Sequence, residues 1–274
     1  MWRVVIAGWE WDETLFAGTA EHYLRGRLPY ADGLAGAVER AFGLDGRGRL
    51  LDVGCGPGNV TVTLAPLFEA AVGLDPDAGM RAEAEREAGR RNIPDLRWVR
   101  MRAEELPAGL GEFRMITVAS SFHWMDQERV AATVLRMLEP GGVFVHVSDL
   151  KGPKAGPVPP YGEIGALVRR YLGPVRRAGQ GVIAGGTTPS GEVQVITAAG
   201  FEAYERILVP DGRVLERDVD DLVAWTFSQS GSAPHLFGDR KAEFERELRA
   251  LLQAGAPYHE RVPPTELKTW RKPR

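Results

Sequence analysis

Three glycines on alternate positions follow a short apolar run, in the sequence Leu50-Leu51-Asp52-Val53-Gly54-Cys55-Gly56-Pro57-Gly58-Asn59. Glycine has no Cβ, so a glycine-rich turn after a buried strand lets a ligand approach bare backbone. Dinucleotide-binding proteins use G-x-G-x-x-G at such a turn. Gly54 and Gly56 fit that pattern, but Asn59 stands at its last position. The loop therefore departs from the dinucleotide-binding pattern, and a nicotinamide-dependent oxidoreductase is a less favoured interpretation of it. No Gly-Lys-Ser/Thr follows, which excludes a P-loop.

Other side chains capable of chemistry follow apolar runs further along the chain. Asp75 ends one such run, where a carboxylate can accept two ribose hydroxyls together; the alternative is a turn residue ahead of Pro76. His123 follows another run, and imidazole can take a proton near neutral pH. His235 is a second candidate base. For both histidines the competing interpretation is a purely structural role.

The elements that must position these residues alternate between strand and helix from residue 49 to 149, which is typical of βαβ units and a parallel sheet. The apolar runs predict strands at Arg49–Val53, Ala71–Leu74, Leu96–Arg100, Arg114–Ser120 and Val143–Ser148. Helices are predicted at Ala78–Arg90, at Asp126–Leu138 with Asp126 as N-cap, and at Asn59–Ala70. In Asn59–Ala70 the Val-Thr alternation favours a strand, but a parallel neighbour at Ala71 requires a crossover, so a helix is preferred.

Fewer signals mark the remaining segments. Residues 12–42 predict one or two helices, and Lys151–Pro160 and Gly173–Gly191 predict loops. Further helices are predicted at Val193–Ala199, Asp218–Ser228 and Asp239–Ala254, and further strands at Tyr204–Val209 and Leu267–Lys272.

Composition limits the class of protein and its partners. The 274 residues carry a net charge of −3, which argues against nucleic acid or an acidic membrane as partner. No apolar run is long enough to span a bilayer, and no signal peptide is recognisable. With one cysteine, Cys55, no intrachain disulfide can form, and a cytoplasmic location is expected. Cys55 is interpreted as a small loop-filling residue. No metal site is predicted, and the oligomeric state is not indicated.

Four segments within residues 49–149, in order, resemble the motifs of class I S-adenosylmethionine-dependent methyltransferases. They are the glycine-rich LLDVGCGPGN, VGLDPD (Val72–Asp77), AEELP (Ala103–Pro107) and SSFHWMD (Ser120–Asp126), the last followed by LEPGG (Leu138–Gly142). SSFHWMD is similar to the small-molecule group that includes trans-aconitate methyltransferase and many bacterial natural-product enzymes.

The resemblance implies an α/β fold: a Rossmann-like, doubly wound, mostly parallel seven-stranded sheet with helices on both faces, plus helical and loop lid elements. It also implies a single methyltransferase domain over residues 1–274. Within it, residues 1–48 would form an N-terminal helical lid segment, 49–149 the cofactor-binding core, and 150–274 the substrate-side insertions and C-terminal strands.

The resemblance further implies S-adenosyl-L-methionine as cofactor and S-adenosyl-L-homocysteine as product. Arg27, with Tyr23 nearby, would bind the methionine carboxylate. The family often has an acid at the position of Arg102, so Glu104 is the alternative acid for the adenine amine. The implied cofactor-binding residues are Arg27, Asp52, Gly54, Gly56, Asp75, Pro76, Ala103, Glu104 and Ser120.

The implied reaction is methyl transfer to an oxygen, nitrogen or carbon nucleophile of a small molecule, such as a bacterial secondary metabolite. The alternative within the same family is a non-methylating reaction, such as a cyclisation. Two groups leave a functional and a structural interpretation open. One group is four arginines, which could clamp an acidic substrate or form a solvated surface, the preferred interpretation; they are Arg169, Arg170, Arg176 and Arg177. The other group is three tryptophans, which could form a lid over the substrate or anchor the N-terminal segment; they are Trp2, Trp9 and Trp11.

Overall fold

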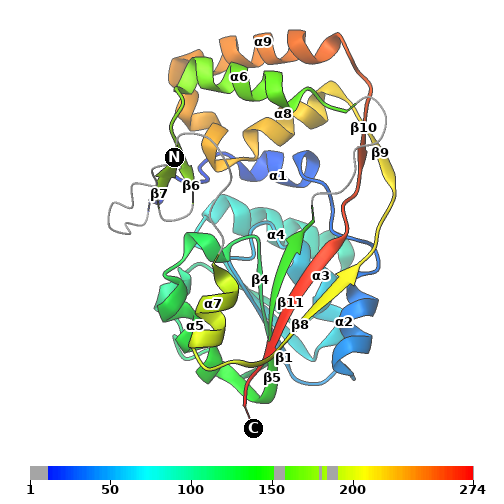
Figure 1. Cartoon of the computed structure of the whole chain (residues 1–274), viewed down its shortest axis with the longest axis vertical. Helices are drawn as coiled ribbons and strands as arrows, with labels where there is room; N and C mark the ends of the chain where they lie inside the picture. The colour runs from blue at the N-terminus through cyan, green and yellow to red at the C-terminus, as the bar shows by residue number, and fades with distance from the viewer. Residues whose placement is uncertain (1–11, 151–157, 179–180, 184–190, 274) are drawn as a thin grey trace. The chain divides into compact units, whose positions relative to one another are not determined.

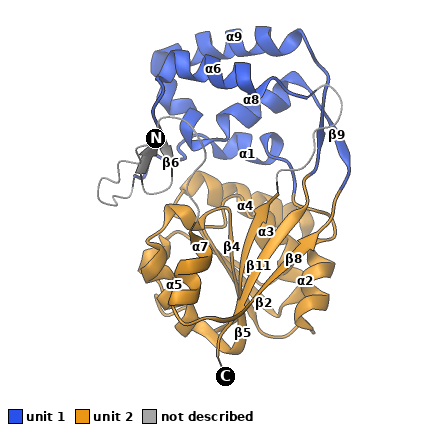
Figure 2. Ribbon diagram, viewed as in Figure 1, with its two compact units in different colours: residues 1–29, 151–188, 212–262 blue, residues 30–150, 189–211, 263–274 orange. Residues whose placement is uncertain are grey.

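The computed structural model describes residues 12–150, 158–178, 181–183 and 191–273. The chain forms two compact units, each assembled from three separate segments (Figure 2). Unit 1 comprises residues 1–29, 151–188 and 212–262, and unit 2 comprises residues 30–150, 189–211 and 263–274. The expected lid segment 1–48 is thus divided between the two units. Trp2, Trp9 and Trp11 lie outside the described residues.

Unit 2 is built around a seven-stranded sheet with the order β3-β2-β1-β4-β5-β11-β8 (Figure 1). The strands β1 to β5 run parallel, whereas β11 pairs antiparallel with both β5 and β8. The order reverses between β1 and β4, and open α/β sheets bind ligands at the carboxyl ends of such strands. The predicted doubly wound, mostly parallel sheet is confirmed. Its strands are β1 (Arg49–Val53), β2 (Ala70–Leu74), β3 (Leu96–Val99), β4 (Phe113–Ala119), β5 (Leu138–Asp149), β8 (Glu202–Val209) and β11 (Thr265–Arg271).

Helices cover both faces of this sheet, as predicted, because its strands alternate between two cores. In β1, Leu50 packs in the core beneath α2 (Leu34–Phe42) and α3 (Asn59–Leu64). Leu51 and Val53 pack in the opposite core, beneath α5 (Gln127–Met137) and α7 (Glu192–Ala198). Figure 1 shows these two pairs of helices on opposite sides of the sheet. The remaining helix of unit 2, α4 (Ala78–Arg91), connects β2 to β3.

Two local predictions in unit 2 show how context decides between helix and strand. The segment from Asn59 forms α3 and then a 3-10 turn, η1 (Ala65–Leu67), so the crossover outweighs its Val-Thr alternation. Pro66 lies in that turn, where its missing N–H ends the α-helix. Strand β5 begins at Leu138 rather than at the predicted Val143, because the Glu-Pro-Gly-Gly sequence is absorbed as an irregularity in its pairing with β4.

Unit 1 is mainly helical. Its helices α1 (Ala20–Gly26), α6 (Tyr161–Leu172), α8 (Val219–Phe227) and α9 (Lys241–Gln253) are stacked as layers (Figure 1). A core of Phe227, Phe237, Phe244 and Leu248 holds α8 and α9 together. Two antiparallel pairs complete the unit: β9 (Val214–Arg217) with β10 (Tyr258–Arg261), and β6 (Arg176–Ala178) with β7 (Gly181–Ile183).

The helices α1, α2, α7, α8 and α9 confirm sequence predictions, whereas α6 and the two small strand pairs were not predicted. Strand β10 reads Tyr-His-Glu-Arg and is recognisable only beside β9, which lies far away in the sequence. Among the described residues, no helix is both long and apolar enough to cross a membrane.

Candidate cofactor-binding and catalytic site

The glycine loop after β1 requires glycine for two different reasons. Gly54, Gly56 and Gly58 all have positive φ, between +54° and +84°, which L side chains rarely adopt. A Cβ on Gly54 would lie 2.8 Å from the side chains of Ser121 and Met125, so packing alone excludes a larger residue. A Cβ on Gly56 would meet nothing within 4 Å. The backbone of Gly56 therefore faces open space in which a ligand could approach.

Asp75, directly after β2, is bonded to this loop. Its Oδ2 accepts the Gly56 N–H at 2.9 Å, and its Oδ1 accepts the Asp77 N–H at 2.9 Å. Burial raises the pKa of this carboxyl to about 6, against the effect of the two backbone hydrogen bonds. Each oxygen retains a second lone pair, so the carboxylate can still accept from a ligand. Pro76 uses its carbonyl to accept from Arg100 Nε at 3.2 Å.

Asp52 lies inside the sheet rather than at its edge. It is fully buried, and its two oxygens accept from Thr61 Oγ1 at 2.5 Å and Thr117 Oγ1 at 2.7 Å. Burial raises the pKa of this carboxyl to about 6, against the opposing effect of the hydrogen bonds from the two hydroxyls. Because Thr61 belongs to α3, the contact fixes the helix that follows the glycine loop. This geometry suits Asp52 to orienting the glycine loop rather than to touching a ligand.

The segment after β3 carries Ala103 and Glu104 on a 3-10 turn, η2 (Ala103–Glu105), and both residues are buried. Glu104 Oε1 accepts the Asp126 N–H at 2.8 Å, which connects this turn to the start of α5. Asp126 in turn caps α5, as predicted, by accepting the Arg129 N–H at 3.2 Å. The carboxylate of Glu104 is therefore oriented by backbone next to the loop that carries His123.

That loop follows β4. Ser120 has a φ of +52° and donates its N–H to Val147 O at 3.1 Å, while Ser121 Oγ donates to Val53 O at 3.0 Å. His123 lies on the 3-10 turn η3 (Phe122–Trp124), with its ring centroid 4.8 Å from that of Trp124. Burial lowers the pKa of His123 to about 4, and the carboxylate of Glu192 opposes the shift. At neutral pH this imidazole is uncharged and has a lone pair that can accept a proton, but the lowered pKa makes it a weaker base than an ordinary histidine.

Sequence reasoning underrated two residues near His123. His146 on β5 and Glu192 on α7 are both buried, and the charge of Glu192 acts on both histidines. Burial lowers the pKa of His146 to about 4. Its Nδ1 is buried and has no hydrogen-bond partner among the described residues. Strand alternation places His146 on the same face as Phe144, which is readable from sequence, but the position of α7 over that face is not.

Arg27 and His235 belong to unit 1. The guanidinium carbon of Arg27 lies 5.1 Å from the Tyr23 ring centroid, and its Nη2 donates to Ser228 O at 3.1 Å. The Arg27 Nε is buried without a partner among the described residues. Nδ1 of His235, an exposed side chain, lies 3.0 Å from Ala17 O. Arg27 thus keeps an unused buried donor, whereas His235 is engaged on the surface.

Three further observations limit the chemistry. Burial raises the pKa of the Cys55 thiol, so it stays protonated and is a poor nucleophile, in agreement with its interpretation as a filling residue. No cluster of His, Cys, Asp and Glu in the described part of the chain could hold a metal ion. Arg169 and Arg170 are exposed, and Arg170 pairs with Glu247 on the surface, which fits the preferred interpretation of these arginines.

Residues 50–142 match a protein family described as a methyltransferase domain. Among curated relatives, the probable S-adenosylmethionine-dependent methyltransferase CRG1 of Saccharomyces cerevisiae is 30% identical over 125 residues, which cover 45% of this chain and 43% of that protein. The uncharacterized methyltransferase sll0829 of Synechocystis is 37% identical over 38% of this chain and 48% of that protein. The chain spans about half the length of these curated relatives.

Solved structures extend the likeness over most of the chain. The crystal structure of YcgJ from Bacillus subtilis superposes with a TM-score of 0.52 at 19% identity, covering 88% of this chain and 98% of that one. At such identities the likeness shows the fold alone. The matches agree with the resemblance of four sequence segments to class I methyltransferase motifs.

Proposed function

We propose that the protein is a class I S-adenosylmethionine-dependent methyltransferase that methylates an oxygen, nitrogen or carbon nucleophile of a small molecule, in keeping with the methyltransferase-domain match over residues 50–142. The observation that carries this proposal is the hydrogen bond from Gly56 N–H to Asp75 Oδ2. It joins a loop amide beside open space to a carboxylate with free lone pairs, at the carboxyl ends of β1 and β2.

The residues present fit the cofactor. Asp75, beside Pro76, would accept the ribose hydroxyls. The N–H groups of Gly54 and Gly56 already donate to Leu74 O and Asp75 Oδ2, so these glycines would contribute a bare backbone beside which the methionine portion can lie. Ala103 and Glu104 would hold the adenine, and Ser120, directly after β4, is the last residue that we assign to the cofactor site. The buried Nε of Arg27, which has no partner within the part of the chain that the structure describes, supports the methionine carboxylate as its ligand, because a buried N–H without an acceptor is costly. Asp52 acts from below by orienting α3.

The bound cofactor supplies an electrophilic methyl group, so the residues of this chain mainly align the acceptor and exclude water. Alignment of reactants can contribute ~7–11 kcal/mol, more than the roughly hundred- to ten-thousand-fold help of a base. We assign the base to His123, which is uncharged at neutral pH. His235 is the second candidate, and its exposed position makes water exclusion harder.

We assign the choice of acceptor to the segments outside residues 49–149, namely the expected lid over 1–48 and the insertions over 150–274. A bacterial secondary metabolite is the acceptor class that the SSFHWMD segment favours. The net charge of −3 fits neither nucleic acid nor an acidic membrane as partner. With a single cysteine, we expect the protein to act in the cytoplasm.

The main alternative keeps the cofactor and omits the methyl transfer. The [4+2]-cyclase SpnF shares the fold, with a TM-score of 0.50 at 19% identity over 90% of this chain. The two reactions differ in product mass, because only the methyltransferase adds a methyl group and releases S-adenosylhomocysteine. An oxidoreductase fits less well, since the loop departs from the dinucleotide pattern at Asn59.

Calorimetric titration of the purified protein with S-adenosylhomocysteine, with NAD run in parallel, tests the proposal. Micromolar binding of S-adenosylhomocysteine alone is the expected result. Binding of NAD instead would establish the oxidoreductase, and binding of neither by the folded protein would exclude both. Incubation with labelled S-adenosylmethionine and candidate acceptors then identifies the methylated product by mass.

A further inference from the structure

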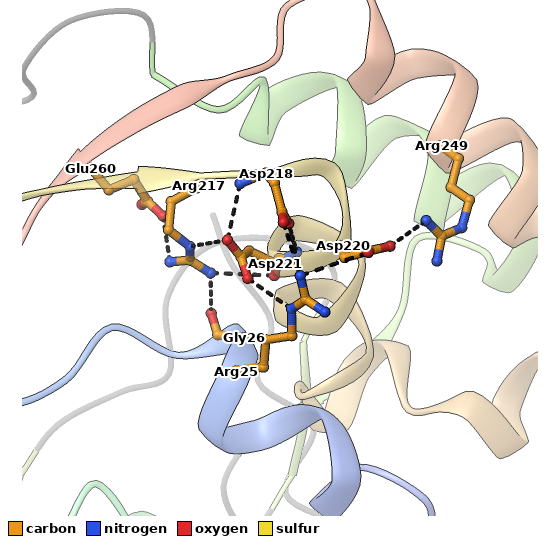
Figure 3. Close-up of polar contacts among 8 residues, drawn as sticks. All are labelled: Arg25, Gly26, Arg217, Asp218, Asp220, Asp221, Arg249 and Glu260. Carbon is orange, nitrogen blue, oxygen red and sulfur yellow. Dashed lines mark hydrogen bonds and ion pairs between the residues drawn. The ribbon is translucent and has the colours of Figure 1, made fainter.

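The end of α1 is fixed at three consecutive residues within unit 1. Arg25 donates through Nε to Asp221 Oδ1 at 2.8 Å and through Nη2 to Asp218 Oδ2 at 3.0 Å (Figure 3). Gly26 O accepts from Arg217 Nη2 at 2.8 Å. Arg27 donates to Ser228 O at 3.1 Å. These contacts attach the last turn of α1 to both ends of α8.

Arg217 is the buried member of this set. It is 4% exposed and donates to Glu260 Oε2 at 2.9 Å, to Gly26 O at 2.8 Å and, more weakly, to Asp221 O at 3.3 Å. Figure 3 shows its guanidinium between Glu260 and Gly26. The last four carbonyls of a helix have no partner within the helix, so Arg217 supplies the donor that Gly26 O would otherwise lack.

Backbone packing explains why glycine precedes Arg27. A Cβ on Gly26 would lie 2.4 Å from Trp225 N and 2.6 Å from Ala224 O. The backbones of α1 and α8 are therefore in direct contact at this point. Any larger residue would move the end of α1, and with it the guanidinium of the next residue.

Arg27 is the residue that this arrangement holds in place. Its Nη2 is occupied by Ser228 O, its guanidinium lies over the Tyr23 ring, and its Nε is buried without an acceptor among the described residues. An arginine held on one side and unsatisfied on the other is suited to receive one carboxylate.

We propose that Arg217 is a positioning residue: through Gly26 O it sets the Arg27 guanidinium to bind the α-carboxylate of S-adenosylmethionine. This inference rests on the proposed function and adds to the proposed site a residue that lies in no recognisable sequence motif. Arg217 itself touches no ligand. Its removal should therefore weaken only those ligands that possess the carboxylate.

Two ligands separate this role from general damage. S-adenosylhomocysteine contains the amino acid portion, and 5′-methylthioadenosine lacks it. We expect Arg27→Met to weaken S-adenosylhomocysteine at least about tenfold in calorimetry, because a hydrogen bond to a charged group is lost, with 5′-methylthioadenosine changed less than about twofold. Arg217→Met and Gly26→Ala should show the same selectivity at about fivefold or more, and Arg217→Lys, which keeps a donor, a smaller loss.

Two control variants complete the experiment. Leu248→Ala truncates a fully buried side chain of α9 in the core of unit 1 and reports on general destabilisation. Arg249→Gln removes an arginine whose ion pair with Asp220 is exposed. Both should bind the two ligands as the wild type does.

The outcomes are distinct. If Arg27→Met is selective and Arg217→Met and Gly26→Ala are not, Arg217 has no positioning role and the inference is overturned. The same conclusion follows if Leu248→Ala loses S-adenosylhomocysteine as selectively as Arg217→Met. If the wild type binds no S-adenosylhomocysteine, the proposed function fails and the inference fails with it.

Discussion

The two units hold their polar groups in different ways. In unit 2, Asp75 and Glu104 accept hydrogen bonds from backbone amides of nearby loops. In unit 1, Arg217 and Arg25 are held largely by side chains and by turns of chain far away in the sequence. Backbone contacts at strand ends follow from the sheet topology, whereas the contacts of unit 1 depend on particular side-chain pairs. The loop carboxylates of unit 2 should therefore keep their positions when neighbouring side chains change, with Asp52 and its two threonine partners as the exception. Unit 1 should be sensitive to a change of its buried arginine, Arg217.

The largest effect is expected in the glycine loop. Gly54→Ala introduces a Cβ 2.8 Å from Ser121 and Met125 at a positive φ, so we expect at least about a hundredfold loss of S-adenosylhomocysteine affinity and a lower melting temperature. Gly89→Ala on α4 is the matched control, because a Cβ there meets nothing within 4 Å. It should be neutral or stabilising by ~0.5–1 kcal/mol. Equal affinity of Gly54→Ala and wild type would show that the loop adapts.

Asp75→Ala should weaken S-adenosylhomocysteine at least about tenfold, because it removes a charged acceptor worth ~1.5–3 kcal/mol. Asp77→Ala is the control: Asp77 caps α4 by accepting from Met80 N, so its loss should cost ~1 kcal/mol of stability without a matching loss of affinity. Calorimetry and thermal melting of both variants separate the two effects.

The raised pKa of Asp75, about 6, also predicts a pH dependence. Ligand affinity should fall as the pH drops through 6, since protonation removes the carboxylate. Stability should change in the opposite direction. The carboxyl of the unfolded chain ionises near its ordinary pKa, whereas that of the folded protein stays protonated up to about pH 6. The free energy of unfolding should therefore decrease as the pH rises from about 4 to about 6. A pH-independent affinity in this range would contradict the assignment of Asp75.

A change of His123 is expected to have an intermediate effect and to compare the two units directly. His123→Gln should lower kcat about tenfold or more, up to the range typical of a lost base, with little change in the KM for S-adenosylmethionine. His235→Gln is the matched variant in unit 1. If that variant loses the rate instead, the base lies in unit 1. With a lowered pKa of about 4, His123 should leave kcat at saturating S-adenosylmethionine flat from pH 7 down to about pH 5, although the affinity for the cofactor falls in that range through Asp75.

The smallest effect is expected at an exposed ion pair of unit 1. Arg249 pairs with Asp220 at 2.6 Å, but both side chains are about half exposed. Arg249→Gln should change the free energy of unfolding by less than about 0.5 kcal/mol in urea titration. A larger change would mean that the pair contributes to the buried network around Arg217.

The sheet of unit 2 could be predicted because each of its core strands is marked by residues within that strand and the turn that follows it. Each strand of the core is a short apolar run, and Asp75 and the glycines follow directly from strand ends. The site residues of unit 1 were harder to find. Arg27 was suggested only by resemblance, and Arg217 not at all, because its partners Gly26 and Glu260 lie in other segments of the chain. His146 lies within the predicted strand Val143–Ser148, but its nearness to Glu192 depends on how α7 packs.

The position of β11 has a consequence for how the molecule can be made. In the seven-stranded sheet, β11 lies between β5 and β8, although it follows both in the sequence. During synthesis, β5 and β8 therefore each keep an unpaired edge until residues 265–271 have left the ribosome. All the segments of unit 1 leave the ribosome before residues 265–271 do. Unpaired strand edges invite association with other chains. Nascent chains stalled within the preceding helix, α9, should thus be the most prone to aggregate, and completion of β11 should lower this tendency.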